Sequence, residues 1–275
     1  MKNEILNYLK EKKININSFE QLSQLEIINS PIILNIILKE DNPNLINFFS
    51  ENAWNEENIC LLFEKYPDIQ RIPWNIMPST KCLHITIKNN FFNQIDKFIR
   101  KAVTEDILNL FIEKCKLYEI KEIPFIFSTQ DLLNKLIENN LLYYASSMNS
   151  RFWNDDIIKS FCKQLDNYPG KLNYDTIMYL NNSEILYSLL KNKRYEKIYL
   201  MNNWNNKCID LIINNIDDYL QKGYKIPIKL YDNSNLLNTL LKNKKLEYIE
   251  YFNTDAWNEE NIYLVVNLIY KGELE

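Results

Sequence analysis

Ala53-Trp54-Asn55-Glu56-Glu57-Asn58-Ile59 recurs almost unchanged near the end of the chain, as Ala256-Trp257-Asn258-Glu259-Glu260-Asn261-Ile262. Looser copies lie between these two segments. The positions equivalent to the tryptophan are Trp54, Val103, Trp153, Trp204 and Trp257, with spacings of 49, 50, 51 and 53 residues. Self-similarity at a period near fifty residues indicates a repeat architecture.

The polar residue after each of these five positions is of a type that caps helix N-termini. In the first copy, Trp54 before the cap and Ile59 four residues beyond it have the spacing of a hydrophobic staple, and all five copies keep this apolar pair. Acidic pairs such as Glu56/Glu57 complement the positive end of a helix dipole. We therefore predict five helices that begin after Asn55, Thr104, Asn154, Asn205 and Asn258.

A second set of five helices is predicted upstream of these, each with its own capping residue. A leucine stands four residues past each cap, and mostly apolar residues follow at seven and eight, which is a helical stripe. The helices should end at Lys88-Asn89-Asn90 and its equivalents, because asparagine tolerates the left-handed conformation that stops a helix. The predicted caps are Ser30, Ser79, Thr129, Asn182 and Asn233.

Two further features complete the predicted units. A short apolar stretch with an isoleucine (Ile46, Ile95, Ile198 or Ile249) predicts a third helix between the other two. An Ile-Pro step closes three units, at Pro73, Pro124 and Pro227, and a Tyr-Pro-Gly turn at Pro169 replaces it in another.

The predicted fold is all-α, an α-solenoid of about five three-helix repeats of roughly 50 residues with a partial N-terminal unit. We expect one helical-repeat domain over 1–275, a helix over 1–13, and a kink near Gly170. The predicted boundaries are 1–29 for the partial unit and 30–78, 79–128, 129–181, 182–232 and 233–275 for the repeats.

This pattern of periodicity and capping resembles the α-helical solenoid repeat proteins as a class, such as the armadillo, HEAT and ankyrin-like families. The resemblance covers nearly the whole chain. It implies stacked units with an extended binding surface. It assigns no site residues, because the diagnostic motifs of those families are absent from the sequence.

The composition narrows the classes of function. With 46% hydrophobic and 25% charged residues, the chain has the make-up of a soluble folded protein. A formal net charge of −4 is not that of a typical nucleic-acid-binding protein, although a local basic patch would be compatible with it. Five cysteines without a CxxC pair are typical of reduced, mostly buried thiols, and no stretch is long enough to span a membrane. We expect a cytoplasmic location, in the producing cell or in a host.

The residues that could carry chemistry have a structural interpretation. Adjacent carboxylates on a helix project in different directions, so the acidic pairs do not converge on one point. The recurring tryptophans could stack on bases or sugars, but their repetition favours a core role. His84 is the only histidine, which excludes a multi-histidine metal site within one chain, and we expect it to be a half-buried packing residue. Tyrosines such as Tyr143, Tyr144, Tyr248 and Tyr251 could serve an interface or the core.

We therefore predict a non-enzymatic scaffold that binds another protein, without catalytic, cofactor-binding or metal-binding residues. Within that class, a dedicated inhibitor, immunity or host-interaction protein of a low-GC microbe or its virus is favoured. The alternative is a helical-repeat protein that binds or processes nucleic acid through a basic face. No motif specifies the partner or the binding residues.

Overall fold

The computed structural model describes residues 7, 11, 27–40, 43–117 and 120–272. Within these ranges every regular element is an α-helix or a 3-10 helix, which confirms the all-α prediction. The helix expected over residues 1–13 lies outside the described residues, apart from residues 7 and 11.

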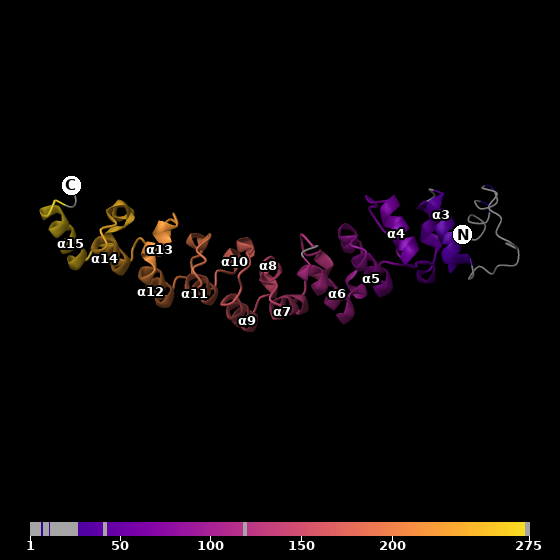
Figure 1. The fold of residues 1–275 in the computed structure, drawn as a ribbon, viewed down its shortest axis with the longest axis horizontal. Helices are drawn as coiled ribbons and strands as arrows, with labels where there is room; N and C mark the ends of the chain where they lie inside the picture. The colour runs from indigo at the N-terminus through magenta and orange to yellow at the C-terminus, as the bar shows by residue number, and fades with distance from the viewer. Residues whose placement is uncertain (1–6, 8–10, 12–26, 41–42, 118–119, 273–275) are drawn as a thin grey trace. The chain divides into compact units, whose positions relative to one another are not determined.

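The chain forms two compact units, residues 1–135 and residues 136–275. In each unit, α-helices that follow one another in the sequence pack side by side (Figure 1). In unit 1 the contacts run from α3 to α4, α5 and α6, and in unit 2 they connect α9, α11, α12, α14 and α15 in order.

Five helices of nine residues each begin where the first set of caps predicts. Ser79 accepts a hydrogen bond from the backbone N–H of Cys82 at 3.1 Å, and Thr129 accepts one from Leu132 at 3.1 Å. The leucine four residues past every cap is fully buried, so the predicted stripe forms the core. The helices are α3 (Pro31–Lys39), α5 (Thr80–Lys88), α7 (Gln130–Glu138), α11 (Ser183–Lys191) and α14 (Ser234–Lys242).

The second set of predicted helices is also present. Each predicted cap residue accepts a hydrogen bond from a backbone N–H in the first turn, as Asn154 does from Ile157 at 2.9 Å. The helices are α4 (Glu56–Lys65), α6 (Glu105–Lys116), α9 (Asp155–Leu165), α12 (Asn206–Asn214) and α15 (Glu259–Tyr270).

The element between these helices differs from the prediction of a third α-helix. It is a 3-10 helix in four places and a single α-helical turn in the fifth, because a segment of three to six residues closes too few i→i+4 hydrogen bonds to nucleate a stable α-helix. The elements are η1 (Pro43–Phe48), η3 (Phe92–Lys97), α8 (Leu142–Ala145), η7 (Ile198–Leu200) and η9 (Leu246–Tyr251).

Further short elements make the five predicted repeats unequal. One group stands just before the recurring tryptophan position and comprises η2 (Glu51–Ala53), η4 (Arg100–Ala102), η6 (Ser150–Phe152) and η10 (Thr254–Ala256). The other follows α6, α9 and α12 and comprises η5 (Phe125–Phe127), α10 (Tyr174–Leu180), α13 (Ile216–Gln221) and η8 (Ile228–Leu230).

The predicted stop signals act through a left-handed residue. After α5, Asn90 has φ 63°, its N–H donates to Ile87, and the N–H of Phe91 donates to Thr86, which is the Schellman pattern. The same two bonds follow α7, α11 and α14, at Asn140, Lys193 and Lys244. Among the described helices, none is both long and apolar enough to cross a membrane.

Candidate interaction surface

The Ile-Pro steps place one large apolar side chain in solvent each time. The residue after the proline is Trp74, Phe125 or Ile228, and these side chains are 72%, 70% and 74% exposed. Single exposed apolar side chains are common on protein surfaces, but these three recur at the same position of a repeated turn. We call Trp74, Phe125 and Ile228 the post-proline residues.

The local backbone explains their exposure. The proline carbonyl accepts a hydrogen bond from the residue three positions later, at 3.0 Å from Ile76 and at 2.8 Å from Leu230. The third residue of each turn is buried in the core, whereas the first residue points away from it. The turn after Pro124 is also held by the Asp96 carboxylate, which accepts a hydrogen bond from the N–H of Ile126 at 3.2 Å.

Each unit has a hollow that includes residues of an Ile-Pro segment. In unit 1 a groove of about 740 Å³ is lined by Ile123 and Pro124 together with Phe91 and Phe92. In unit 2 a pocket of about 400 Å³ is lined by Ile226 and four tyrosines. Phe125 directly follows the Ile123–Pro124 lining of the groove, and Ile228 lies two residues after Ile226 of the pocket wall.

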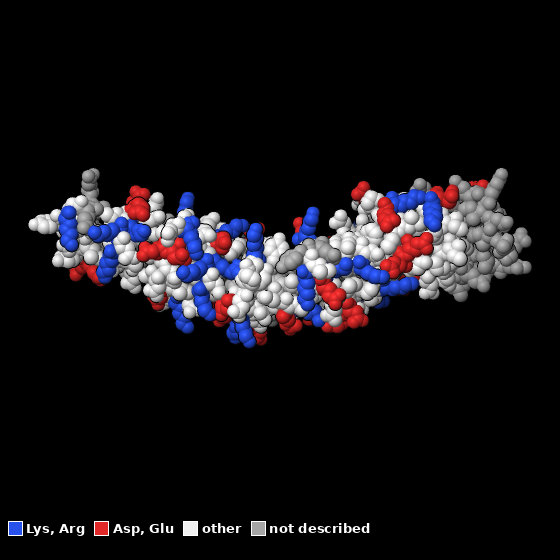
Figure 2. All heavy atoms as spheres, viewed as in Figure 1, with Lys and Arg blue, Asp and Glu red and all other residues white. Residues whose placement is uncertain are grey.

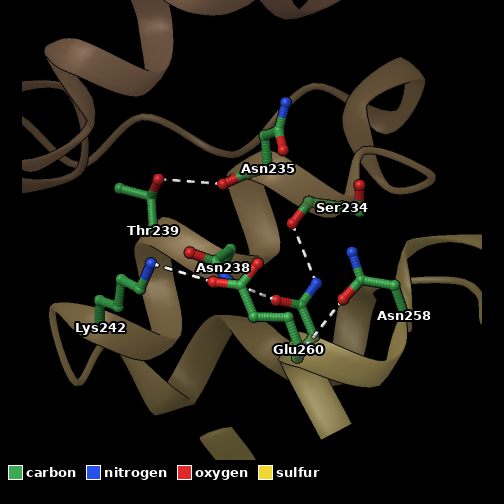
Figure 3. Close-up of polar contacts among 8 residues, drawn as sticks. Ser234, Asn235, Asn238, Thr239, Lys242, Asn258 and Glu260 are labelled. Atoms are coloured by element: carbon green, nitrogen blue, oxygen red, sulfur yellow. Dashed lines mark hydrogen bonds and ion pairs between the residues drawn. The ribbon is translucent and has the colours of Figure 1, made fainter. Parts of the chain in front are cut away.

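The Trp-Asn stretch, by contrast, is occupied by contacts within the fold. Asn261 is fully buried, and its amide donates to the carbonyls of Ser234 and Ala256 at 3.0 and 2.9 Å (Figure 3). It also accepts from Asn238 at 2.9 Å. Figure 3 shows Asn238 and Lys242 of α14 turned toward Glu260 of α15, and Lys242 pairs with Glu260 at 3.2 Å.

The same network exists in unit 1. Asn58 is fully buried and donates to Pro31 and Ala53, both at 2.9 Å, and it accepts from Asn35 at 2.9 Å. We call this network of hydrogen bonds around the buried asparagine the asparagine clamp. The sequence prediction did not identify it. The sequence did contain a signal for it. Only in the first and last repeats does an asparagine stand five residues past the first cap while another stands three residues past the second cap.

Several of the acidic side chains inside the caps reach the ends of neighbouring helices. Glu56 contacts Lys88 at 3.0 Å and Asn89 at 3.1 Å, and hydrogen bonds from Asn89 and Lys88 lower the pKa of its carboxyl group. The pKa of Glu260 is lowered in the same way by Asn238 and Lys242. These carboxylates are ion-pair partners between helices, an arrangement that favours the structural interpretation over acid–base chemistry.

The tryptophans differ in burial along the chain. Trp54 is fully buried, and its indole N–H finds no hydrogen-bond partner in the described structure. Trp153 and Trp204 are half-buried and donate to the carbonyls of Met148 and Met201 at 3.3 and 2.8 Å.

The burial of the second staple residue changes along the chain. The residues four beyond the cap are buried in the first three copies, as Ile59, Leu108 and Ile158, but Ile262 is 50% exposed. The physical reason is the packing of the helix: α4 lies between α3 and α5, whereas α15 packs on α14.

The remaining candidates for chemistry do not converge. His84 is exposed, so its prediction as a half-buried residue is wrong. Cys82, Cys115 and Cys208 are buried and Cys60 and Cys162 are half-buried, all as free thiols. Burial raises the pKa of Cys82 to about 11, which is the state of an inert thiol. No group of three metal-binding side chains occurs in the described part of the chain.

A groove of about 1000 Å³ lies beside α9, α11 and α12 in unit 2, and most of the residues that line it are polar or charged. Within this groove, Asp166 pairs with Lys191 at 2.7 Å and accepts from Asn192 at 2.9 Å. Burial raises the pKa of Cys162, on the groove wall, to about 12. Asp166, Lys191 and Cys162 are therefore not available as an acid, base or nucleophile in this groove.

Basic and acidic side chains are interspersed on the face shown in Figure 2. Many lysines are paired, for example Lys135 with Glu105 at 2.5 Å and Lys197 with Asp175 at 2.8 Å. Such a distribution is unlike the basic stripe of a protein that tracks a phosphate backbone.

Comparison of this chain with known protein families, with curated proteins and with solved structures found no match.

Proposed function

We propose that the protein is a non-enzymatic scaffold that binds another protein through the post-proline residues. The observation that carries the proposal is the recurrence of one exposed, large apolar side chain after each Ile-Pro step. Tryptophan and phenylalanine are enriched among the residues that dominate binding energy at protein interfaces. Within unit 1, a partner of extended shape would contact Trp74 and Phe125 at once.

The same proposal includes the finer architecture, an α-solenoid of about five repeats of roughly 50 residues. It is supported by the five nine-residue helices, by the capped helix that follows each of them, and by contacts between successive helices within each unit. Stacked units of this kind present extended surfaces suited to one macromolecular partner.

Nucleic acid is the less favoured partner. The net charge of −4 and the pairing of many lysines with carboxylates leave little positive potential for a phosphate backbone. A retardation assay across salt concentrations should show no salt-sensitive binding of DNA or RNA.

The test of the proposal compares two double variants in affinity purification from the native cell. We expect the wild-type protein to retain one stoichiometric partner, identified by mass spectrometry, and Trp74→Ser with Phe125→Ser to lose it. Both side chains are mostly in solvent, so the substitutions should change the free energy of unfolding by less than about 0.5 kcal/mol.

The matched control is Lys81→Ser with Lys101→Ser, which alters two exposed side chains of the same unit. It should keep the partner, and the interaction should be reproduced with the two purified proteins. Retention of the partner by the Trp74/Phe125 variant, or the lack of any stoichiometric partner, would contradict the proposal.

A further inference from the structure

Four tyrosines gather around one pocket of unit 2. The pocket has a volume of about 400 Å³, within the range of ligand sites, and its wall is built from the loop after α13, the residue after η8 and the helix η9. Tyr251 is 48% exposed and the other three tyrosines are half-buried, so the aromatic rings are accessible from solvent. The tyrosines are Tyr224, Tyr231, Tyr248 and Tyr251.

The pocket is backed by a packed aromatic cluster. Tyr224 lies 5.4 Å from Tyr219 and 5.8 Å from Tyr195, measured between ring centroids. The hydroxyl of Tyr219 donates to the carbonyl of Lys225 at 2.6 Å, which fastens the loop to α13. On the opposite side, Tyr231 stacks on Tyr251 at 6.0 Å with 21° between the rings. The wall is therefore held in place before any ligand arrives, which lowers the entropy lost on binding.

The tyrosine hydroxyls and the Lys225 ammonium of this pocket can all donate hydrogen bonds to a ligand. Within the described residues, the four tyrosine hydroxyls make no hydrogen bond, in contrast to the hydroxyls of Tyr195 and Tyr219 behind them. Lys225 also lines the pocket, and an ammonium group can only donate. The complementary ligand has flat apolar faces for the rings and exposed hydrogen-bond acceptors for the hydroxyls.

We propose that this pocket binds a proline-rich segment of a partner protein in the polyproline II conformation. Such a segment has no internal hydrogen bonds, so its carbonyl groups remain free to accept from tyrosine hydroxyls. Its proline rings stack on aromatic side chains, and its stiffness reduces the entropy lost when it docks. The inference rests on the proposed function and names a partner class for a second surface, in unit 2.

The surrounding charges argue against the other ligands that aromatic walls accept. Lys225 in the pocket, and Lys222 with its ammonium 4.9 Å from the centre of the Tyr195 ring, disfavour a quaternary ammonium group. Glu247 and Glu250 alternate with the pocket tyrosines on η9 and repel the phosphates of a nucleic acid that would stack its bases there.

The experiment measures the fluorescence anisotropy of a labelled decaproline peptide with the full-length protein. We expect saturable binding of decaproline and none of a Gly-Ser peptide of equal length. Tyr251→Ala and Tyr248→Ala should each weaken binding by about tenfold or more, the loss of one ring stacked on the ligand. Tyr248→Phe, which keeps the ring and removes the donor, should weaken it by a smaller factor.

The matched control is Tyr263→Ala on α15, a tyrosine of the same unit that is 67% exposed and outside the pocket. It should leave the affinity unchanged, and circular dichroism should show the same helix content for all variants. Absence of proline-dependent binding at millimolar peptide would overturn the proposal. So would tighter binding of oligothymidine or tetramethylammonium that the same tyrosine substitutions abolish.

The outcome is separable from that of the proposed function. Loss of the cellular partner in the Trp74/Phe125 variant tests unit 1, whereas decaproline binding tests the tyrosines of unit 2. If the Trp74/Phe125 variant loses the cellular partner but decaproline does not bind, the protein is a scaffold without a polyproline site.

Discussion

At the scale of single residues, two buried asparagines matter more than the acidic pairs beside them. Asn58 and Asn261 stand in the two near-identical copies, and each donates two hydrogen bonds to carbonyls and accepts one from an asparagine of the neighbouring helix. In the other copies the equivalent position holds a buried Ile107, Ile157 or Cys208. The site thus accepts either an apolar side chain or a fully satisfied amide.

The first prediction concerns this clamp. Asn58→Ala removes the donor to Pro31 and Ala53 and leaves buried polar groups without a partner, so the free energy of unfolding should fall by about 1–3 kcal/mol. Urea denaturation followed by circular dichroism measures the change. Asn93→Ala, at an exposed asparagine of the same unit, should change it by less than about 0.5 kcal/mol. Equal losses in the two variants would show that the clamp contributes nothing.

At the scale of elements, two of the nine-residue helices end at a lysine whose backbone is in the strained left-handed conformation. The left-handed position is asparagine after α5 and α7, but lysine after α11 and α14, with φ 54° at Lys193 and 56° at Lys244. A side chain with a Cβ is disfavoured there, and glycine is the residue that most helices use.

The second prediction follows from that strain. Lys193→Gly and Lys244→Gly should each raise the free energy of unfolding by about 0.5–1 kcal/mol, because glycine adopts positive φ without the steric penalty. Lys163→Gly, inside α9, should lower it by about 1 kcal/mol, as glycine does in a helix interior. Thermal unfolding of the three variants tests this, and a loss of stability at position 193 or 244 would refute the assignment of strain.

At the scale of the whole molecule, the α-helix contacts within each unit connect neighbours along the chain. In such an arrangement a destabilised helix affects its own neighbours first, and stability is a sum of local terms. Leu83 in α5 and Leu237 in α14 are both fully buried and occupy equivalent positions in units 1 and 2.

The third prediction uses this pair. Leu83→Ala should speed amide hydrogen exchange in α3–α6 and leave α14 and α15 nearly unchanged, since the loss of about 2–5 kcal/mol stays within unit 1. Leu237→Ala should produce the reverse pattern. Exchange that accelerates uniformly through both units in either variant would mean that the chain unfolds as a single cooperative body.

Helix starts and helix ends were the most predictable features. A cap such as Asn154 and a stop such as Asn90 act through hydrogen bonds that close within a few residues, so residue type and spacing specify them. The single-domain organisation and the kink near Gly170 stay predictions. A third helix was predicted in each repeat, but apolar spacing alone did not separate the 3-10 helices of four repeats from the single α-helical turn, α8, of the other.

The candidate surface was less predictable than the fold. The Ile-Pro steps at Pro73, Pro124 and Pro227 were predicted to close repeats. The spacing did not indicate that Trp74 and Phe125 would face solvent while Ile76 and Phe127 would be buried. Tyr248 and Tyr251 were candidates for either core or interface, and their place in a pocket with Tyr224 and Tyr231 depends on segments more than twenty residues apart.

By itself, the sequence determined the all-α class, the register of the helices and the cap at each helix start, because these depend on interactions between residues close in the chain. Only the tertiary structure decided which member of each repeated pattern is buried. Ile59 and Ile262 occupy the same place in near-identical segments, yet one is fully buried and the other is half exposed, because α4 lies between two helices and α15 packs on α14. Burial is a property of the neighbours that a residue meets in space, and a local pattern contains no information about them.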